Sequence, residues 1–408
     1  MSKNQILPHL FREEYSKIVA VLCKTYGLSN IESAEDIVSD AFLKATETWG
    51  MRGVPDNPTA WLFKVAKNLA IDHFKRKNIF NEKITPELQS AHQKEIFEET
   101  DLSDDNINDS LLRMMFAVCH PSITTESQIA LSLRVLCGFG VDEIANALLS
   151  TKSNINKRLT RTKKTLRTID FKVSPISSND LNQRLEGVLS VIYLLFNEGY
   201  FSTNSSEKIR KDLCFEAMRL LHIVISQEET NLQETNALMA LFCFQVSRFD
   251  ARINQAGEQI LYNEQDSKKW NIELIKKGEY YLWQSRSNKP SRYLMEAMIA
   301  FWHTRKTYNQ IEKWENILQL YNRLLQIHYS PVIALNRTFA LAMVKGKKVA
   351  LKEALKIKLE QNSLYYSLLA ELYIDSNTTK RIECLKKAIH FSKNENDILV
   401  LENKLKDA

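Results

Sequence analysis

The chain has 408 residues, of which 25% are charged, and a formal net charge of +6 at pH 7. This length predicts two to three domains, and the small number of turn residues, 10 glycines and 8 prolines, favours long helices with short connections. The mild charge excludes a surface that is basic throughout, so any nucleic-acid-binding surface must be local. The sequence shows neither an apolar signal segment nor a run of 18 apolar residues, so we expect a cytoplasmic protein without a membrane partner.

The six cysteines form no CxxC pair, which is typical of reduced thiols rather than of a disulfide framework. Cys119, His120 and Cys137 are three possible metal ligands, but no fourth lies at zinc-site spacing. A buried thiol and a capping or core histidine is the favoured interpretation. We therefore expect no metal and no cofactor.

The sequence pattern predicts three helices within residues 6–77. In the second helix, 31–49, apolar residues recur at helical spacing and the opposite face is acidic. That face carries Glu32, Glu35, Asp36, Ser39 and Asp40. The third helix, 59–77, is expected to be capped by Thr59 and to end in a basic run. An ordinary bundle with solvated charged faces is the alternative.

Residues 78–110 contain nine acidic residues and two basic ones, with weak hydrophobic periodicity. This composition predicts a solvated acidic linker that is partly helical at most. The sequence VDEIANALL, followed by a polar turn and a basic helix capped by Ser153, then predicts a helix-turn-helix within 111–172. In the basic helix Ile155, Leu159, Thr162 and Leu166 would face inward. A generic basic amphipathic helix is the alternative.

Two of these segments resemble a known family. AEDIVSDAFLKA and WLFKVAKNLAIDHFKRK resemble region 2 of sigma-70 family initiation factors, most closely the extracytoplasmic-function (ECF) group, and the helix-turn-helix resembles region 4. MFAVCHP, RLEGVLSVIYLLFNEGY and DLCFEAMRL resemble an ECF subgroup with a long C-terminal extension. The resemblance implies an alternative sigma factor that binds core RNA polymerase and promoter DNA and is not an enzyme.

It also implies roles for individual residues. In region 2, residues 1–77, four side chains would bind the polymerase β′ clamp: Glu35, Asp36, Ser39 and Asp40. Five would bind the −10 element: Lys64, Lys67, Asn68, Arg76 and Lys77. Region 4, residues 111–172, would meet the β flap and read the −35 element through Ser153, Asn154, Asn156, Lys157, Arg158 and Arg161. Lys and Arg can neutralise phosphates or contact guanine, and Asn can contact base edges.

After a short linker, residues 181–408 read as helical throughout, so the expected fold class is all-α. Two hairpin patterns, one around Gly346 and one around Leu369, Ala370 and Tyr373, resemble tetratricopeptide (TPR) units. Such hairpins stack into a surface that binds protein or peptide. We expect this domain to regulate the factor in cis.

Two other function classes are considered. A helix-turn-helix regulator with a TPR-like scaffold would bind DNA without acting on polymerase. An enzyme in the C-terminal part is disfavoured, since the sequence has no HExxH, no glycine-rich phosphate loop and no nucleophile elbow.

Overall fold

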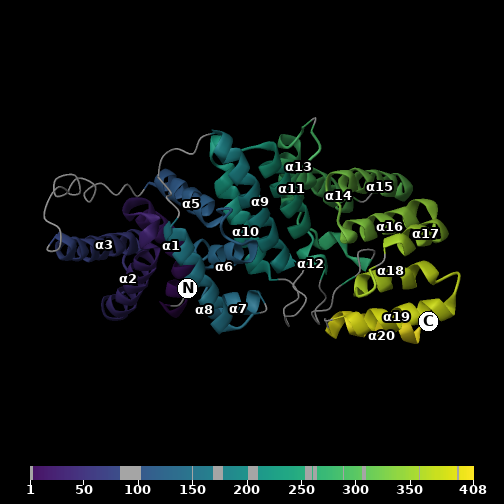
Figure 1. Cartoon of the computed structure of the whole chain (residues 1–408), viewed down its shortest axis with the longest axis horizontal. Coiled ribbons are helices and arrows are strands. Elements are labelled where there is room, and N and C mark those ends of the chain that lie inside the picture. Colours follow the sequence, from purple (N-terminus) through teal and green to yellow (C-terminus); the bar gives the residue numbers. More distant parts are fainter. Residues whose placement is uncertain are drawn as a thin grey trace. The chain divides into compact units, whose positions relative to one another are not determined.

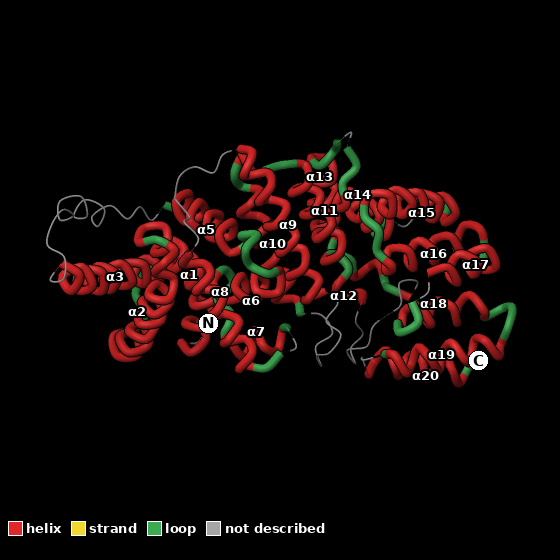
Figure 2. Tube along the Cα trace, in the orientation of Figure 1, coloured by secondary structure: helices red, strands yellow, loops and turns green. Residues whose placement is uncertain are grey.

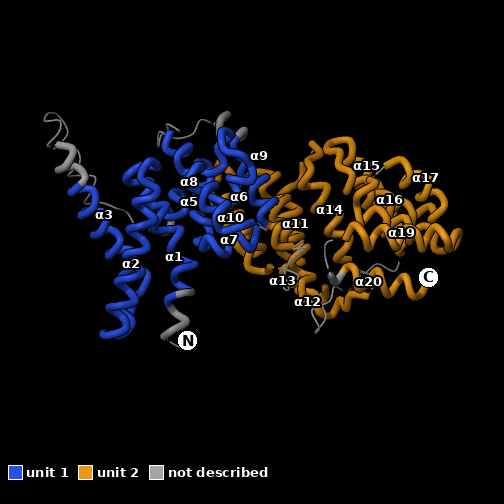
Figure 3. Tube along the Cα trace, turned by 60° about the horizontal axis from the view of Figure 1, so that its bottom comes forward, with its two compact units in different colours: residues 1–195 blue, residues 196–408 orange. Residues whose placement is uncertain are grey.

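The computed structural model describes residues 3–82, 103–148, 150–168, 178–200, 210–252, 260, 264–287, 289–305, 309–357, 359–392 and 395–408. Every regular element in these ranges is a helix, which confirms the all-α prediction (Figures 1 and 2). The chain divides into two compact units, Met1–Leu195 and Phe196–Ala408 (Figure 3). The second unit therefore begins later than the predicted position 181.

Unit 1 begins with three long helices, here called the N-terminal bundle. They are α1 (Lys3–Tyr26), α2 (Ile31–Arg52) and α3 (Pro58–Glu82), with the short 3-10 turn η1 (Leu28–Asn30) between the first two. Gly27 has a φ of +88°, a conformation that favours glycine, and it ends α1 where the sequence predicted. The apolar stripe of α2 is buried as expected, with Val38 and Ala41 fully inaccessible.

The second bundle of unit 1 follows. It consists of α5 (Asp104–Val118), α6 (Thr125–Val135), α7 (Val141–Ala147) and α8 (Lys152–Thr168). Helix α8 packs on α6 and α7, as a helix-turn-helix requires. Both bundles belong to one compact unit, in which α1 packs along α5 and α8 reaches η1.

Three local predictions are corrected. Asn57, not Thr59, accepts a hydrogen bond from the backbone of Ala60 and caps α3. Thr151, not Ser153, accepts from the Asn154 backbone N–H at 3.2 Å, so α8 starts at Lys152, two residues earlier than a cap at Ser153 implies. The acidic linker is shorter than predicted, because α5 begins at Asp104 behind the cap residue Ser103. Residues 83–102 lie outside the described ranges.

Helix α9 (Ser178–Tyr200) crosses the unit boundary. The helices that follow in unit 2 are α10 (Lys211–Ile225), α11 (Gln233–Val246), α12 (Phe249–Arg252), α13 (Ile272–Gln284), α14 (Arg292–His303), α15 (Gln310–Ile327), α16 (Pro331–Lys345), α17 (Lys347–Ile357), α18 (Ser363–Tyr373), α19 (Thr378–Phe391) and α20 (Glu395–Lys406). Two 3-10 turns, η2 (Glu228–Thr230) and η4 (Ser267–Lys269), lie between them. From α14 onward each helix packs on the next, as in a stack of helical hairpins.

Candidate nucleic-acid and polymerase interface

The acidic face of α2 is divided between solvent and the protein interior. Asp36, Ser39 and Asp40 are exposed, as predicted for a partner-binding surface. Glu35 is only 4% exposed, which differs from the expectation that it shares this face. It follows Ile31 by four residues and precedes Val38 by three, so it belongs to the buried stripe of the helix.

Glu35 lies where the two bundles meet. Its Oε1 accepts a hydrogen bond from Tyr15 Oη at 3.1 Å and one from Arg134 Nε at 2.8 Å. Its Oε2 forms an ion pair with Lys163 of α8. Burial and the neighbouring Glu35 carboxylate raise the pKa of Tyr15 far above its usual value, so this tyrosine stays protonated and donates.

Arg134 contacts residues of both bundles at this point. Besides its bond to Glu35 it donates from Nη1 to the carbonyl oxygen of Phe139 at 3.2 Å. Its guanidinium lies 5.5 Å from the centre of the Tyr15 ring, within range of a cation–π contact. No local sequence pattern marks Arg134 for this role.

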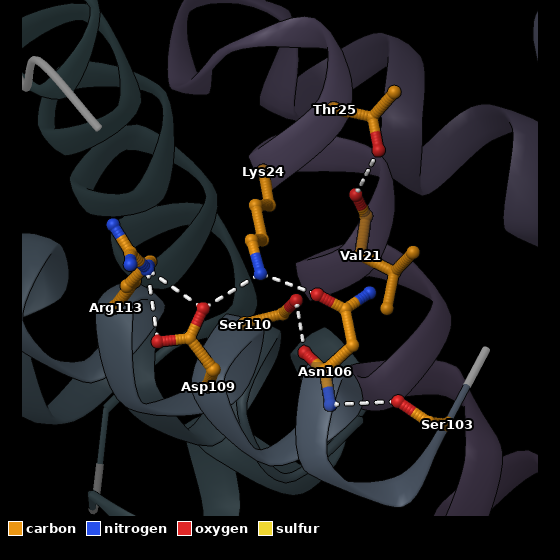
Figure 4. Close-up of polar contacts among 8 residues, drawn as sticks. All are labelled: Val21, Lys24, Thr25, Ser103, Asn106, Asp109, Ser110 and Arg113. Carbon is orange, nitrogen blue, oxygen red and sulfur yellow. Dashed lines mark hydrogen bonds and ion pairs between the residues drawn. The ribbon is translucent and has the colours of Figure 1, made fainter. Parts of the chain in front are cut away.

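A second polar contact joins α1 to α5 (Figure 4). Lys24 Nζ lies 2.6 Å from Asp109 Oδ2 and also donates to Asn106, while Arg113 Nε lies 2.8 Å from the same Asp109 oxygen. Burial alone would raise the pKa of Asp109, but the hydrogen bonds from Lys24 and Arg113 lower it. Asp109, predicted as a linker acid, is therefore part of the contact between the bundles.

The basic face of α3 is turned outward. Lys64, Asn68 and Arg76 are exposed and Lys67 is partly buried. The side chain of Lys77 lies outside the described residues. Trp61 is partly buried and packs edge-on against Trp49, with ring centres 5.3 Å apart, so it belongs to the bundle core.

Most of the predicted DNA-facing residues of α8 are exposed. These are Ser153, Asn154, Asn156, Lys157 and Arg161. Arg158 is partly buried, with Nη2 2.8 Å from Glu126 Oε2. Further along the helix, Lys163 pairs with Glu35 and Arg167 with Glu32, so this half of α8 faces α2.

Cys119, His120 and Cys137 are possible metal ligands that the sequence itself disfavours. In the described part of the chain no three His, Cys, Asp or Glu side chains are grouped as metal ligands. Cys119 is buried, which raises the pKa of its thiol to about 12. His120 Nδ1 instead lies 2.8 Å from Ser122 Oγ. None of the helices in the described ranges is both long and apolar enough to span a membrane.

Unit 2 contains a groove of about 610 Å³ along its helical hairpins. Its wall includes partly exposed apolar side chains, among them Val332, Phe339, Met343 and Leu364. His303 lies on the same wall, edge-on to Trp314.

Comparisons with known proteins find a match to the segment that contains α2 and α3. Residues 10–79 match the family model of sigma-70 region 2. The chain is 28% identical over 142 residues to the ECF RNA polymerase sigma factor BldN of Streptomyces coelicolor, which covers 35% of this chain and 52% of that protein. The N-terminal part of the chain is therefore similar to sigma-70 family factors.

Two further matches include residues after this segment. Residues 184–286 match a family of unknown function, DUF6596. An uncharacterized protein of Rhizobium meliloti is 32% identical over 324 residues, 79% of this chain and 76% of that protein, so the likeness extends beyond region 2. No solved structure matches the chain.

Proposed function

We propose that this chain is an alternative sigma factor of the ECF type. It binds core RNA polymerase, recognises the −35 and −10 promoter elements and promotes initiation of transcription. The match of residues 10–79 to sigma-70 region 2 carries this proposal. That range contains both the exposed acidic residues of α2 and the exposed basic face of α3.

On α3, Asn68 is the residue that would hold an unstacked base of the −10 element. The resemblance to ECF factors implies this role for Asn68, and Lys64, four residues earlier on the same helical face, would neutralise a neighbouring phosphate. Removing a base from the stack costs a few kcal/mol, which contacts to the base edge must offset. Lys67, Arg76 and Lys77 would add phosphate contacts.

On α8, the exposed residues from Ser153 to Arg161 would enter the −35 major groove. The first turn presents backbone N–H groups and small polar side chains, and Lys157 and Arg161 follow on the same face. This placement supports the helix-turn-helix as region 4. On α2, Asp36, Ser39 and Asp40 would meet the basic β′ clamp, while the second bundle would meet the β flap.

Promoter-dependent run-off transcription tests the proposal. The full chain would be mixed with bacterial core polymerase and upstream regions of its own genome, at a stated salt concentration. We expect transcripts that need this chain, and losses with Asn68→Ala and Arg161→Ala of about tenfold each, on the scale of 1–3 kcal/mol for one base contact. Lys386→Ala, an exposed lysine of unit 2, is the control. Failure to bind core polymerase would favour the DNA-binding regulator instead.

We further propose that unit 2 regulates the factor in cis, with its groove receiving a peptide or protein. The test is a chain that ends after Leu195 rather than near residue 172, because the α9 segment up to Leu195 belongs to unit 1. A Cβ at Gly187, for example, would lie 3.6 Å from the Cys119 carbonyl oxygen. Altered transcription by this shortened chain supports the proposal, and unchanged transcription contradicts it.

A further inference from the structure

Unit 2 contains a second groove, between α10 and α13, whose lining residues differ from those of the groove described above. Both helices pack on α11, which forms its floor (Figure 1). We infer that this α10–α13 groove is a docking site for an amphipathic helix with acidic flanks, supplied by a partner protein. The groove lies within residues 184–286, the segment that matches DUF6596, so the inference gives that segment a binding role beyond the proposed function.

The walls of the groove are two helix faces that reach solvent. Each wall is a run of side chains at i, i+3, i+4 and i+7, which share one face of a helix. On α10 these are Phe215, Met218, Arg219 and His222, and on α13 they are Glu273, Lys276, Lys277 and Tyr280. Phe215 is 50% exposed and Tyr280 58%, so each wall presents a large ring to a partner.

The floor of the groove is apolar. It consists of Met239 and Cys243 of α11, both buried, with Met218 and Leu274 partly buried beside them. Methionine side chains are flexible and adapt to the shape of a partner. The groove has a volume of about 580 Å³, so a partner must bring apolar side chains to fill it.

The helical lining determines the backbone of the partner. Because α10, α11 and α13 bond their own backbone groups internally, they offer few backbone hydrogen bonds to a partner. An extended strand would bury its backbone N–H and C=O groups against apolar side chains, which is costly. A helix satisfies its own backbone and presents apolar side chains at a matching spacing. Single-stranded nucleic acid would need flat rings for stacking along the floor, where this groove has Met239 and Cys243.

The charges of the lining favour an acidic partner. Three cations, Arg219, Lys276 and Lys277, outnumber one carboxylate, Glu273. Arg219 pairs with Glu216 at 2.9 Å, and Lys276 pairs with Glu273 at 3.2 Å on an exposed surface, where such pairs are weak. Lys277 is exposed and forms no ion pair within the described part of the chain. Carboxylates on the flanks of a docked helix would therefore meet an excess of positive charge.

Peptide binding by the full chain, without polymerase or DNA, tests the inference. The probe is a labelled synthetic helix of about 18 residues, or five turns, built of Leu, Ala and Glu. Its leucines lie at i, i+3, i+4 and i+7, and its glutamates lie on both flanks. We expect micromolar binding, read as a rise in fluorescence anisotropy. A peptide with the same leucines spread around the helix, and one with Lys in place of Glu, should each bind about tenfold more weakly.

Single replacements locate the binding. Phe215→Ala and Tyr280→Ala each remove an exposed ring and should weaken binding about tenfold. Tyr329→Ala, an exposed ring elsewhere in unit 2, should leave it unchanged. Lys277→Glu should weaken binding of the Glu-flanked peptide about tenfold and strengthen that of the Lys-flanked peptide, a gain that also shows a folded variant. Lys386→Glu, an exposed lysine of α19, is the charge control.

Several results would overturn the inference. One is absence of binding by the Glu-flanked peptide, and another is an equal loss in the variants and their controls. Displacement of the peptide by a single-stranded oligonucleotide would assign the groove to nucleic acid instead. A loss confined to Phe339→Ala would place the peptide in the other groove of unit 2, and a dimer that Phe215→Ala dissociates would make a second copy the occupant. Because polymerase is absent from every measurement, none of these results decides the proposed function.

Discussion

The two units join their helices by different means. In unit 1 the contact between the bundles centres on charged groups, with Glu35 between Arg134 and Lys163. In unit 2 the helices interlock through apolar rings: Phe196 stacks on Phe242 with centres 3.9 Å apart, and Gly278 of α13 lies against the Phe244 ring of α11.

This difference predicts which of the two contacts can open reversibly. Water solvates separated charges well, so a buried ion pair adds little net stability although it demands the correct partner. An apolar contact has no such compensation when it opens, because the exposed rings lose their burial free energy. We therefore expect the contact in unit 1 to be reversible and the contacts in unit 2 to be permanent.

The largest expected effect comes from breaking the centre of the unit 1 contact. Glu35→Gln leaves Arg134 and Lys163 without their carboxylate. It should lower the free energy of opening of α2 and α8, as hydrogen exchange reports it, by about 3 kcal/mol. Hydrogen exchange, resolved by peptide, measures it in the full chain. Asp36→Asn, the same change at an exposed neighbour, should stay within about 0.5 kcal/mol.

A triple replacement sharpens this test. Changing Glu35 to Leu together with Arg134→Leu and Lys163→Met removes all three charges, and it should recover most of the lost protection. Unchanged protection in Glu35→Gln itself would show that the charges do not hold the bundles together.

The corresponding change in unit 2 is Gly278→Ala. Its Cβ would lie 2.6 Å from Phe244 Cε1, and the buried ring must shift, at a cost of about 2 kcal/mol. Gly50→Ala on α2 is the matched control: nothing lies within 4 Å of its Cβ, so it should stabilise the helix by about 0.5–1 kcal/mol. Equal effects in the two variants, measured by urea unfolding, would contradict the close packing.

Acid should affect unit 2 before unit 1. Burial, with Arg248 and Lys313 nearby, lowers the pKa of His303 to about 3. Since this folded-state pKa lies below the unfolded value of about 6.5, the unfolded chain binds the proton first and stability falls as pH drops below 6.5. At pH 5.5 the loss is about 1.4 kcal/mol.

Asp109 in unit 1 behaves differently. Its pKa is lowered, so its contribution to the stability of unit 1 is complete above the usual aspartate pKa near 4. That contribution is lost only as pH falls below this value. Hydrogen exchange at pH 5.5 and 7.5 should show the larger loss of protection in unit 2, around His303, because the lowered pKa of His120 is the smaller change in unit 1. His303→Phe should remove that difference, and its persistence would argue for another group.

The smallest effect should come from Tyr15→Phe, which removes one hydrogen bond to Glu35 and leaves the ring in place. The expected loss is about 1 kcal/mol, because Arg134 still satisfies the same oxygen. Urea unfolding measures it. A loss as large as that of Glu35→Gln would mean that the hydroxyl, rather than the charge, organises the contact.

Much of the fold could be predicted from local pattern. The hydrophobic periodicity and Gly27 predicted the positions of α1 and α2. The apolar spacing of α8 predicted that four side chains face inward, and all four are buried: Ile155, Leu159, Thr162 and Leu166. The cap predictions at Thr59 and Ser153 were wrong by a short shift. In each case an earlier polar residue, Asn57 or Thr151, can cap equally well. Only the backbone conformation before the helix determines which of the two residues caps it.

The contact between the bundles could not be predicted, because its partners are remote in sequence. Glu35 and Arg134 are 99 residues apart, and no local rule pairs them. A weak signal did exist: Lys163 follows Leu159 by four residues and precedes Leu166 by three, which places a charge at the edge of the buried stripe. Whether that charge meets water or another bundle depends on tertiary packing alone.

The ion pairs of α8 also determine how many ions the protein exchanges with its surroundings. While Lys163 and Arg167 neutralise Glu35 and Glu32, they displace no cations from DNA. Once the bundles separate, each of them that reaches a phosphate releases condensed counterions and steepens the logarithmic salt dependence of DNA binding by about 0.9. In the function proposed above, a chain with separated bundles would therefore hold promoter DNA more tightly in dilute salt and lose it more abruptly as salt rises.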